Sequence, residues 1–311
     1  MQGLVTKSTG SWYQVKGEDG VQYECRIKGK FRIKGIQTTN PIAVGDQVAF
    51  EIEDQHMEQE SARGVIFKLL DRKNYIIRKS INLSKQAQII AANMDAAFLV
   101  VTLASPRTSL GFIDRFLVTA EAYGIPTHLI FNKLDIYTPE GLEILQDYKS
   151  IYENIGYPCH EVSAIKGTNM QSLIDLLKDK TTLFSGHSGV GKSSLINHLL
   201  PGQDIKTGDI SDWSDKGQHT TTFAEMYELP FGGYLIDTPG IRELGIYDIQ
   251  KEELSHYFVE MRERLNTCKF HNCRHINEPG CQIIKAVENG EIEGSRYDSY
   301  QSIYFGNDTR A

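Results

Sequence analysis

The sequence predicts a multidomain protein made of an all-β barrel, an α/β core and a small α-rich domain that contains most of the cysteines. Three observations lead to this prediction. Short strands separated by turn residues fill the first part of the chain. Buried strands then alternate with amphipathic helices, as in a parallel sheet covered on both faces. Three of the five cysteines gather near the end of the sequence. The predicted domains are 1–72, 73–245 and 246–311.

The first domain contains apolar–polar alternations interrupted by glycine, asparagine and proline, which is typical of a small antiparallel barrel. One stretch has cations at five alternate positions, so a strand would carry all of them on one face: Arg26, Lys28, Lys30, Arg32 and Lys34. A solvated outer face would explain them, yet like charges on one strand face repel each other. A bound polyanion such as RNA would relieve that repulsion.

The second domain has apolar runs that predict buried parallel strands at Ala96–Leu103, Thr127–Phe131 and Thr181–Ser185. Helical patterns lie between them, at Phe112–Tyr123 and Asn169–Lys178. This succession indicates a βα repeat with helices on both faces of the sheet.

Composition narrows the class of protein. A net charge of −7 argues against a nucleic-acid partner for the chain as a whole, although local fields differ from the average. The longest apolar run, Ala96–Ala104, is far shorter than the roughly 20 residues of a membrane helix. The first residues lack the apolar stretch of a signal peptide, so we expect a cytoplasmic, monomeric protein with no membrane partner.

Residues 186–193 fit the phosphate-binding pattern G-x-x-x-x-G-K-[ST], between a predicted strand and a helical run. The glycines let successive backbone N–H groups face the phosphates, and the helix N-terminus adds partial positive charge. Lys192 would reach the β- and γ-phosphates, and Ser193 would bind Mg²⁺. The residues expected to contact the nucleotide are Gly186, His187, Ser188, Gly189, Val190, Gly191, Lys192, Ser193 and Ser194.

An N-K-x-D sequence, the guanine-specificity motif of GTPases, follows the strand that ends at Phe131 and consists of Asn132, Lys133 and Asp135 around Leu134. Guanine presents N1–H and a 2-amino group on one edge, and a single carboxylate can accept both. Adenine has no such pair and would leave the buried carboxylate unsatisfied. The pair Ser163-Ala164 resembles the S-A motif whose backbone contacts the guanine oxygen. Together with the P-loop, these motifs predict GTP rather than ATP.

A D-x-x-G motif spans Asp237 to Gly240. Asp237 would hold Mg²⁺ through water, and the Gly240 N–H would contact the γ-phosphate. Three threonines, Thr220 to Thr222, lie where switch I should supply a second Mg²⁺-binding hydroxyl. We favour Thr221 among them.

The order of these motifs is unusual. An ordinary GTPase begins with the P-loop, whereas here N-K-x-D and S-A come first. The same sheet can still form, because the predicted helix Asn169–Lys178 leads directly into the strand before the P-loop. The sequence therefore predicts a circularly permuted GTPase, in which the residues after D-x-x-G connect directly to the C-terminal domain.

Many GTPases carry a glutamine just after D-x-x-G that orients the attacking water. This chain has Ile241 there, which forms no hydrogen bonds through its side chain, so intrinsic hydrolysis should be slow. His219, just before the three threonines, is the nearest polar candidate to orient the water. A solvent-facing loop histidine is an equally good interpretation.

The C-terminal domain starts with a predicted helix, Gln250–Leu265, capped by Asp248, and continues into a cysteine–histidine cluster. Three thiolates and one imidazole suit one tetrahedral zinc ion, and a complete Cys₃His set is structural rather than catalytic. In a reducing compartment such a cluster favours metal binding over disulfides. The expected ligands are Cys268, Cys273, His275 and Cys281, with Lys269, His271 and Arg274 among them as positive charges for RNA.

Taken together, these motifs resemble those of the ribosome small-subunit-dependent GTPases, the RsgA or YjeQ family. The match includes Gly186 to Ser193, the stretch Gly217 to Thr222 and the C-x4-C-x-H-x5-C cluster, and it extends over essentially the whole chain. The resemblance implies an OB-fold N-terminal domain, a permuted GTPase core and a zinc-binding C-terminal domain. It also implies a role late in small-subunit assembly, slow GTP hydrolysis stimulated by that subunit, and contacts of the outer domains with ribosomal RNA.

Three functions remain open from the sequence. The first is a GTP hydrolase that acts as a checkpoint in ribosome assembly, with His219, Lys192 and Thr221 as catalytic residues and Mg²⁺ accompanying GTP. The second is an RNA-binding module in which turnover is incidental, an interpretation that Ile241 favours. The third is a GTPase that acts on another RNA, such as transfer RNA.

Overall fold

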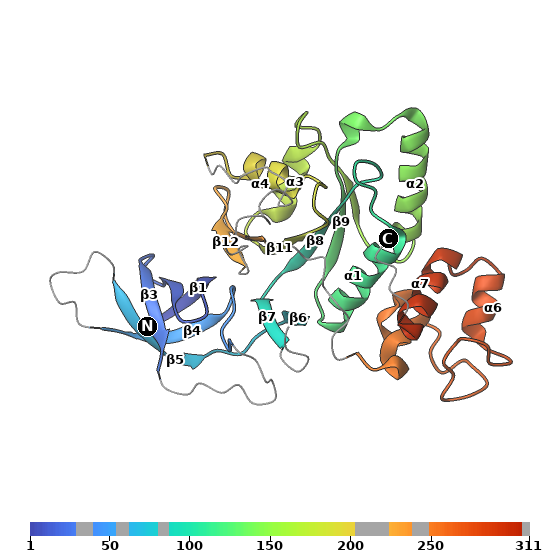
Figure 1. Cartoon of the computed structure of the whole chain (residues 1–311), viewed down its shortest axis with the longest axis horizontal. Helices are drawn as coiled ribbons and strands as arrows, with labels where there is room; N and C mark the ends of the chain where they lie inside the picture. Colours follow the sequence, from blue (N-terminus) through green and yellow to red (C-terminus); the bar gives the residue numbers. More distant parts are fainter. Residues whose placement is uncertain (29–39, 54–61, 80–86, 203–223, 238–248, 307–311) are drawn as a thin grey trace, which may run out of the picture.

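The computed structural model describes residues 1–28, 40–53, 62–79, 87–202, 224–237 and 249–306. A β-barrel, an α/β core and a group of C-terminal helices follow one another along the long axis of the molecule (Figure 1). The core lies between the other two parts in this view (Figure 1).

The N-terminal barrel has five strands: β1 (Gln2–Ser8), β2 (Tyr13–Gly17), β3 (Gln22–Ile27), β4 (Gln47–Ile52) and β5 (Arg63–Leu69). Their order is β1-β2-β3-β5-β4, and a β1–β4 pairing closes the barrel, as the predicted OB fold requires. Alternate residues face inward, and Val15, Cys25 and Phe50 are fully buried in the barrel core. Cys25 is therefore a core residue of the barrel, separate from the cysteine–histidine cluster.

The core sheet contains β10 (Cys159–Glu161), β9 (Thr127–Phe131), β8 (Ala96–Val101), β11 (Thr181–Ser185), β13 (Tyr234–Asp237) and β12 (Glu225–Glu228), in that spatial order. All are parallel except β12, which runs antiparallel to β13 at the edge. Strand β8 is buried on both faces. Leu99 and Val101 belong to one apolar cluster, and Phe98 and Val100 belong to another on the opposite face.

Helices α1 (Leu110–Ala122) and α2 (Pro139–Glu153) cover one face of this sheet, and α3 (Met170–Leu177) and α4 (Lys192–Leu199) cover the other. A short 3₁₀ helix, η1 (Leu134–Ile136), follows β9. This three-layer arrangement confirms the predicted α/β core. It also confirms the permutation, because β9 precedes β11 in the chain while both end at the same edge of the sheet.

The barrel is joined to the core through strand pairing, which the sequence did not predict. Strand β1 pairs antiparallel with β12, with Lys7 opposite Glu225, so that the barrel continues the core sheet. Two ion pairs cross this junction: Lys7–Glu225 at 2.8 Å and Lys16–Glu228 at 2.6 Å. They border a polar cavity of about 220 Å³ between barrel and core. Strand β12 directly follows the segment predicted to be switch I, so the barrel is attached close in sequence to that predicted segment.

The connection between barrel and core is a hairpin of β6 (Tyr75–Lys79) and β7 (Ala87–Ala92). Arg72, just before it, donates two hydrogen bonds of 2.6 Å to the buried carboxylate of Asp46 in the barrel. Gly45 has φ +89°, and a Cβ there would lie 2.1 Å from the carbonyl oxygen of Ala92, so only glycine allows the hairpin to approach this closely.

Replacing Asp46 with alanine should destabilise the barrel and its connection to the core by about 3 kcal/mol, because the buried guanidinium of Arg72 would lose its counter-charge. Hydrogen exchange at barrel amides measures the effect. The same truncation at Glu228, whose ion pair with Lys16 lies at the surface, should leave exchange nearly unchanged. Equal effects of the two substitutions would contradict the assignment of Asp46 as a buried anchor.

The C-terminal domain contains η4 (Lys251–Tyr257), α5 (Val259–Arg262), α6 (Gln282–Glu288) and α7 (Gly294–Phe305). The single helix predicted over Gln250–Leu265 was wrong: the segment begins as a 3₁₀ helix and is interrupted at Phe258, which has an extended backbone. The physical reason is packing, because Phe258 is fully buried and its ring lies edge-on against Tyr300 of α7. The predicted cap, Asp248, lies outside the described residues.

Among the helices that the structure describes, none has the length and apolarity needed to cross a membrane.

Candidate nucleotide site and metal centre

The phosphate-binding loop connects β11 to α4, and Gly191 caps the helix in a left-handed conformation with φ +89°. A Cβ at Gly191 would lie 2.4 Å from Nδ2 of Asn132, and one at Gly186 would lie 2.4 Å from the carbonyl oxygen of Val100. Both positions therefore require glycine for close approach as well as for backbone conformation. The backbone N–H groups in the first turn of α4 have no partner within the helix and can donate hydrogen bonds to a phosphate.

Asn132 brings three motifs together. Its Nδ2 donates to the carbonyl oxygen of Val190 in the P-loop at 2.9 Å, and its Oδ1 accepts from the Ala164 N–H at 3.3 Å. Asn132 is buried, and its own carbonyl oxygen accepts a hydrogen bond of 2.7 Å from the hydroxyl of Tyr137. The amide thus holds the phosphate-binding and base-binding loops at a set distance before nucleotide arrives.

Asp135 and Ser163, both predicted to bind the base, lie next to each other. The Ser163 hydroxyl donates to the Asp135 carboxylate and accepts from the Lys166 N–H at 3.1 Å. Ser163 is buried, whereas Asp135 is exposed. That the Asp135 carboxylate is buried beneath a bound guanine stays a prediction. A base that bonds to this carboxylate would cover it and remove it from water.

Lys192 lies at the start of α4, where its ammonium donates to the carbonyl oxygens of Gly186 at 2.9 Å and His187 at 3.4 Å. Burial lowers the pKa of Lys192, and the carboxylate of Asp237 at the end of β13 opposes that shift. Strands β11 and β13 are neighbours, with Phe184 in register with Asp237. The P-loop lysine and the first residue of D-x-x-G therefore meet at one edge of the sheet, which is where Mg²⁺ and the γ-phosphate would lie.

Several predicted site residues lie outside the described residues: His219, Thr220, Thr221 and Thr222 of switch I, Gly240 and Ile241 after Asp237, and the cations Lys30, Arg32 and Lys34. Their roles stay predictions.

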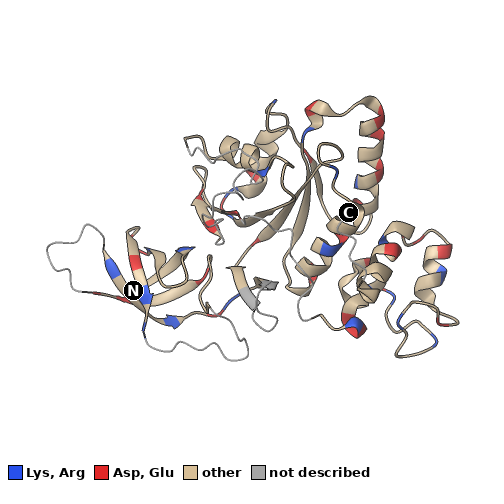
Figure 2. Cartoon of the chain, in the orientation of Figure 1, with Lys and Arg blue, Asp and Glu red and all other residues tan. Residues whose placement is uncertain are grey.

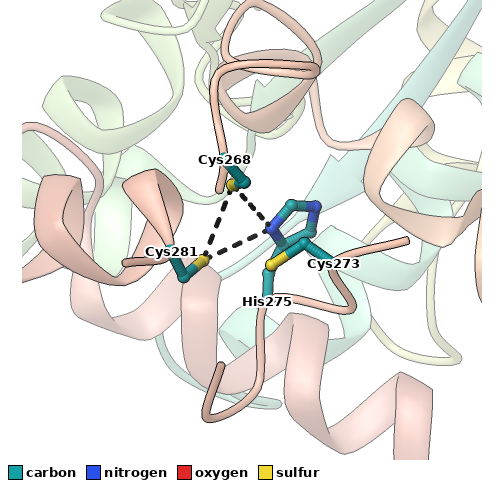
Figure 3. Close-up of side chains that lie close together, drawn as sticks. All are labelled: Cys268, Cys273, His275 and Cys281. Atoms are coloured by element: carbon teal, nitrogen blue, oxygen red, sulfur yellow. Dashed lines mark hydrogen bonds between the residues drawn. The ribbon is translucent and has the colours of Figure 1, made fainter. Parts of the chain in front are cut away.

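The Cys–His cluster, formed by Cys268, Cys273, His275 and Cys281, is the second chemical centre (Figure 3). One ligand atom from each residue lies within 4.8 Å of all the others. The Sγ atoms of Cys268 and Cys281 are 3.9 Å apart, and Nδ1 of His275 lies 3.6 Å from Cys268 and 3.4 Å from Cys281. Sulfurs bound to one tetrahedral zinc at about 2.3 Å would be about 3.8 Å apart, so the donor set fits this ion.

The surroundings of the cluster also suit a cation. Burial lowers the pKa of His275, which keeps the imidazole neutral and able to bind metal, and raises the pKa of Cys273 to about 12. A divalent ion would reverse the second shift, because metal coordination deprotonates thiols. The Gln282 N–H donates to Sγ of Cys268 at 3.4 Å, the type of contact that stabilises a bound thiolate.

Comparison with known proteins agrees with the nucleotide site. Residues 69–247 match the model of the RsgA GTPase family, and residues 2–58 match the RsgA N-terminal domain. The chain belongs to the RsgA GTPase family. It is therefore a GTPase, an enzyme that hydrolyses GTP.

Named relatives match this chain over nearly its whole length. A protein of Christiangramia forsetii named "Small ribosomal subunit biogenesis GTPase RsgA" is 55% identical over 306 residues, which is 98% of this chain and 96% of the relative. A protein of the same name from Bacteroides fragilis is 52% identical, covering 97% and 96% of the two chains.

Two solved structures of the RsgA family have the same fold. YjeQ from Thermotoga maritima superimposes with a TM-score of 0.78 at 36% identity, covering 98% of this chain and 97% of the other. YloQ, described as a circularly permuted GTPase, gives a TM-score of 0.74 at 29% identity, covering 100% and 96%.

Two residues that shape the candidate nucleotide site were not predicted from the sequence. Tyr137 donates to the carbonyl oxygen of Asn132 and accepts from the Leu103 N–H at 2.9 Å, which fixes the loop after β9. Lys166 closes the S-A loop through its backbone. Lys166 lies two positions after Ala164 and could have been found from the S-A motif, whereas nothing in the pattern around Tyr137 indicates its contacts.

Proposed function

We propose that this chain acts in the maturation of the small ribosomal subunit, binding GTP and hydrolysing it slowly until the subunit stimulates turnover. The observation that carries the proposal is identity above 50%, over nearly the whole length of both chains, to proteins named for small ribosomal subunit biogenesis. The partners are the small subunit with its rRNA, and GTP or GDP. The protein works as a monomer in the cytoplasm.

In the proposed site, Lys133 and Asp135 hold guanine with the Ser163-Ala164 backbone, and Asn132 keeps that corner against the P-loop at Val190. Lys192 neutralises the phosphates, and Ser193 and Thr221 bind Mg²⁺. The remaining GTP-binding positions are Gly186, His187, Ser188, Gly189, Gly191, Ser194, Asp237 and Gly240.

The chemistry of hydrolysis follows from the residue after D-x-x-G. Ile241 has no polar side-chain atom, so the isolated protein lacks a fixed group to orient water. We propose that His219 takes this role when the small subunit orders switch I. The barrel could link subunit binding to switch I, because β1 pairs with β12, the strand that follows switch I.

The outer domains supply the RNA contacts. Arg26 and Lys28 are exposed on the barrel but already pair with acids, Arg26 with Glu53 at 2.6 Å and Lys28 with Glu51 at 3.7 Å. Positive and negative residues are interspersed over the barrel (Figure 2), so RNA would have to compete with these partners. We propose that Arg26, Lys28, Lys30, Arg32 and Lys34 form the barrel's RNA-binding residues.

The Cys–His cluster holds one structural zinc, and Mg²⁺ accompanies GTP. Zinc folds the loop that exposes Lys269, His271 and Arg274, which would contact rRNA. The borders of the three domains are proposed at 72/73 and 245/246, which agrees with the barrel's last strand ending at Leu69 and with the C-terminal helices beginning at Lys251.

Turnover of GTP measured with and without purified small subunits tests the proposal. Strong stimulation supports it, and a His219→Ala chain should then bind subunits normally but lose most of the stimulated rate. Binding to the subunit without stimulation would favour an RNA-binding module instead. The absence of both binding and stimulation would favour a GTPase that acts on another RNA. Lys192→Ala serves as the nucleotide-binding control.

A further inference from the structure

Helix α1 contacts two parts of the protein with two different faces. One stripe belongs to the core cluster against the sheet: Ile113, Phe116, Leu117 and Ala120. A second stripe, Asp114, Val118 and Glu121, has the i, i+4, i+7 spacing of one helix face and contacts the C-terminal domain. Helix α1 lies beside α7 in the structure (Figure 1). A single rigid element therefore belongs to the core and supports the C-terminal domain.

The contact with the C-terminal domain is centred on Arg296 of α7. Its Nη1 donates to Asp114 Oδ1 at 2.7 Å, and its Nε and Nη2 donate to both carboxylate oxygens of Glu260 at 2.8 and 3.1 Å. Arg296 is 1% exposed, and its guanidinium also lies 4.7 Å from the ring centre of Phe258. A buried arginine bonded in this way holds one geometry, because any displacement would leave an uncompensated charge.

The N-terminal end of α1 contacts the P-loop. The ring of Phe112, in the first turn, lies with its centre 3.6 Å from that of His187. Pro106, in the loop before the helix, packs on Gly189, where an added Cβ would lie 3.2 Å from the proline Cδ. Ser109 caps the helix by accepting from the Phe112 N–H at 3.3 Å, which fixes the position of the aromatic ring.

We propose that α1 couples the docking of the C-terminal domain to the conformation of the P-loop, with Arg296 and Phe112 as the positioning residues at its two ends. A partner that moves the C-terminal domain would shift α1, and Phe112 would transmit the shift to His187. This route through α1 is separate from the chain segment after D-x-x-G, which connects the core directly to the C-terminal domain. Because coupling is reciprocal, nucleotide binding would also change how firmly the C-terminal domain docks. The inference requires only nucleotide binding, not the ribosomal role.

The test is the dissociation rate of a fluorescent GDP analogue from the full-length chain. Arg296→Met should change this rate by about fivefold or more, the usual lower range for coupled sites. Arg264→Met is the matched control, because the guanidinium of Arg264 bonds to Glu291 and to the backbone of Glu260, both inside the C-terminal domain and neither on α1. The control should leave the dissociation rate as in the unmodified protein.

A double-mutant comparison identifies the route. Phe112→Ala should itself change GDP dissociation, and Arg296→Met should then add no further change. The proposal would be overturned if Arg296→Met changed GDP dissociation as much in the Phe112→Ala background as in the unmodified protein. It would also be overturned if the Arg296→Met single variant kept its zinc and showed an unchanged GDP dissociation rate.

A milder variant covers the case in which Arg296→Met loses zinc and unfolds the domain. Arg262 pairs with Glu121 of α1 at 2.9 Å on the surface of the same interface. Arg262→Glu should change GDP dissociation by about twofold, and adding Glu121→Arg should restore it, since an exposed pair contributes little to folding. Failure of the restoring substitution, or no change with Arg262→Glu, would count against coupling through α1.

Discussion

Replacing Asp135 with asparagine is expected to weaken GTP binding by roughly a hundredfold to a thousandfold and to create binding of XTP. The carboxylate of Asp135 would accept both donors on the guanine edge. An asparagine amide at that position would present its own N–H toward the 2-amino group, so two donors would face each other. Xanthine carries an oxygen in place of that amino group and would accept the hydrogen bond. Titration with fluorescent GTP and XTP analogues measures both effects.

The structure makes this substitution a clean test of base recognition. Ser163 donates to the Asp135 carboxylate, and it can equally donate to an asparagine carbonyl oxygen, so the loop should keep its conformation. Ser163→Ala provides a second variant, which should weaken GTP without any gain for XTP. Unchanged GTP affinity in Asp135→Asn would show that the base binds elsewhere.

Substitution of Cys281 by serine should remove zinc and unfold the C-terminal domain, while GTP binding is retained. Structural zinc contributes about 10–16 kcal/mol of apparent binding free energy in small domains. The small apolar core of the C-terminal domain cannot supply that much stabilisation in its place. The measured zinc content should fall from one ion per chain to none, and hydrogen exchange should accelerate across α6 and α7. Release of α7 from α1 should also alter the rate of GDP dissociation.

Cys159→Ser is the matched control, because Cys159 lies on β10 in the core and outside the Cys–His cluster. That chain should keep one zinc per molecule and normal exchange in α6 and α7. Retention of zinc by the Cys281→Ser protein would exclude Cys281 as a ligand, and loss of GTP binding would mean that the core depends on the metal.

Much of the fold could be predicted because local sequence and tertiary packing agree. The run Thr127–Phe131 is apolar, short and bounded by Pro126 and Asn132, and it forms β9 with the predicted ends. The P-loop was predicted for a similar reason, since its glycines and lysine have a local backbone requirement that no other pattern imitates.

Two elements were not predicted correctly, for different reasons. Helical spacing over Gln250–Leu265 predicted one helix, but burial of Phe258 against Tyr300 is worth more than continuity of a short helix. Helix α2 was not predicted, although Thr138 followed by Pro139 marks a capped helix start, with the Thr138 hydroxyl accepting from Gly141 at 3.2 Å.

By itself the sequence determined the permuted order of the motifs, and from it came the predictions of which residues contact phosphate, which read guanine and which bind metal. These features depend on residue type and close spacing, which the chain carries directly. Only the tertiary structure decided how the parts communicate. The pairing of β1 with β12, the burial of Arg296 between Asp114 and Glu260, and the contact of Phe112 with His187 join residues far apart in the sequence. Their energies arise from burial and mutual geometry, and these exist only after the chain has folded.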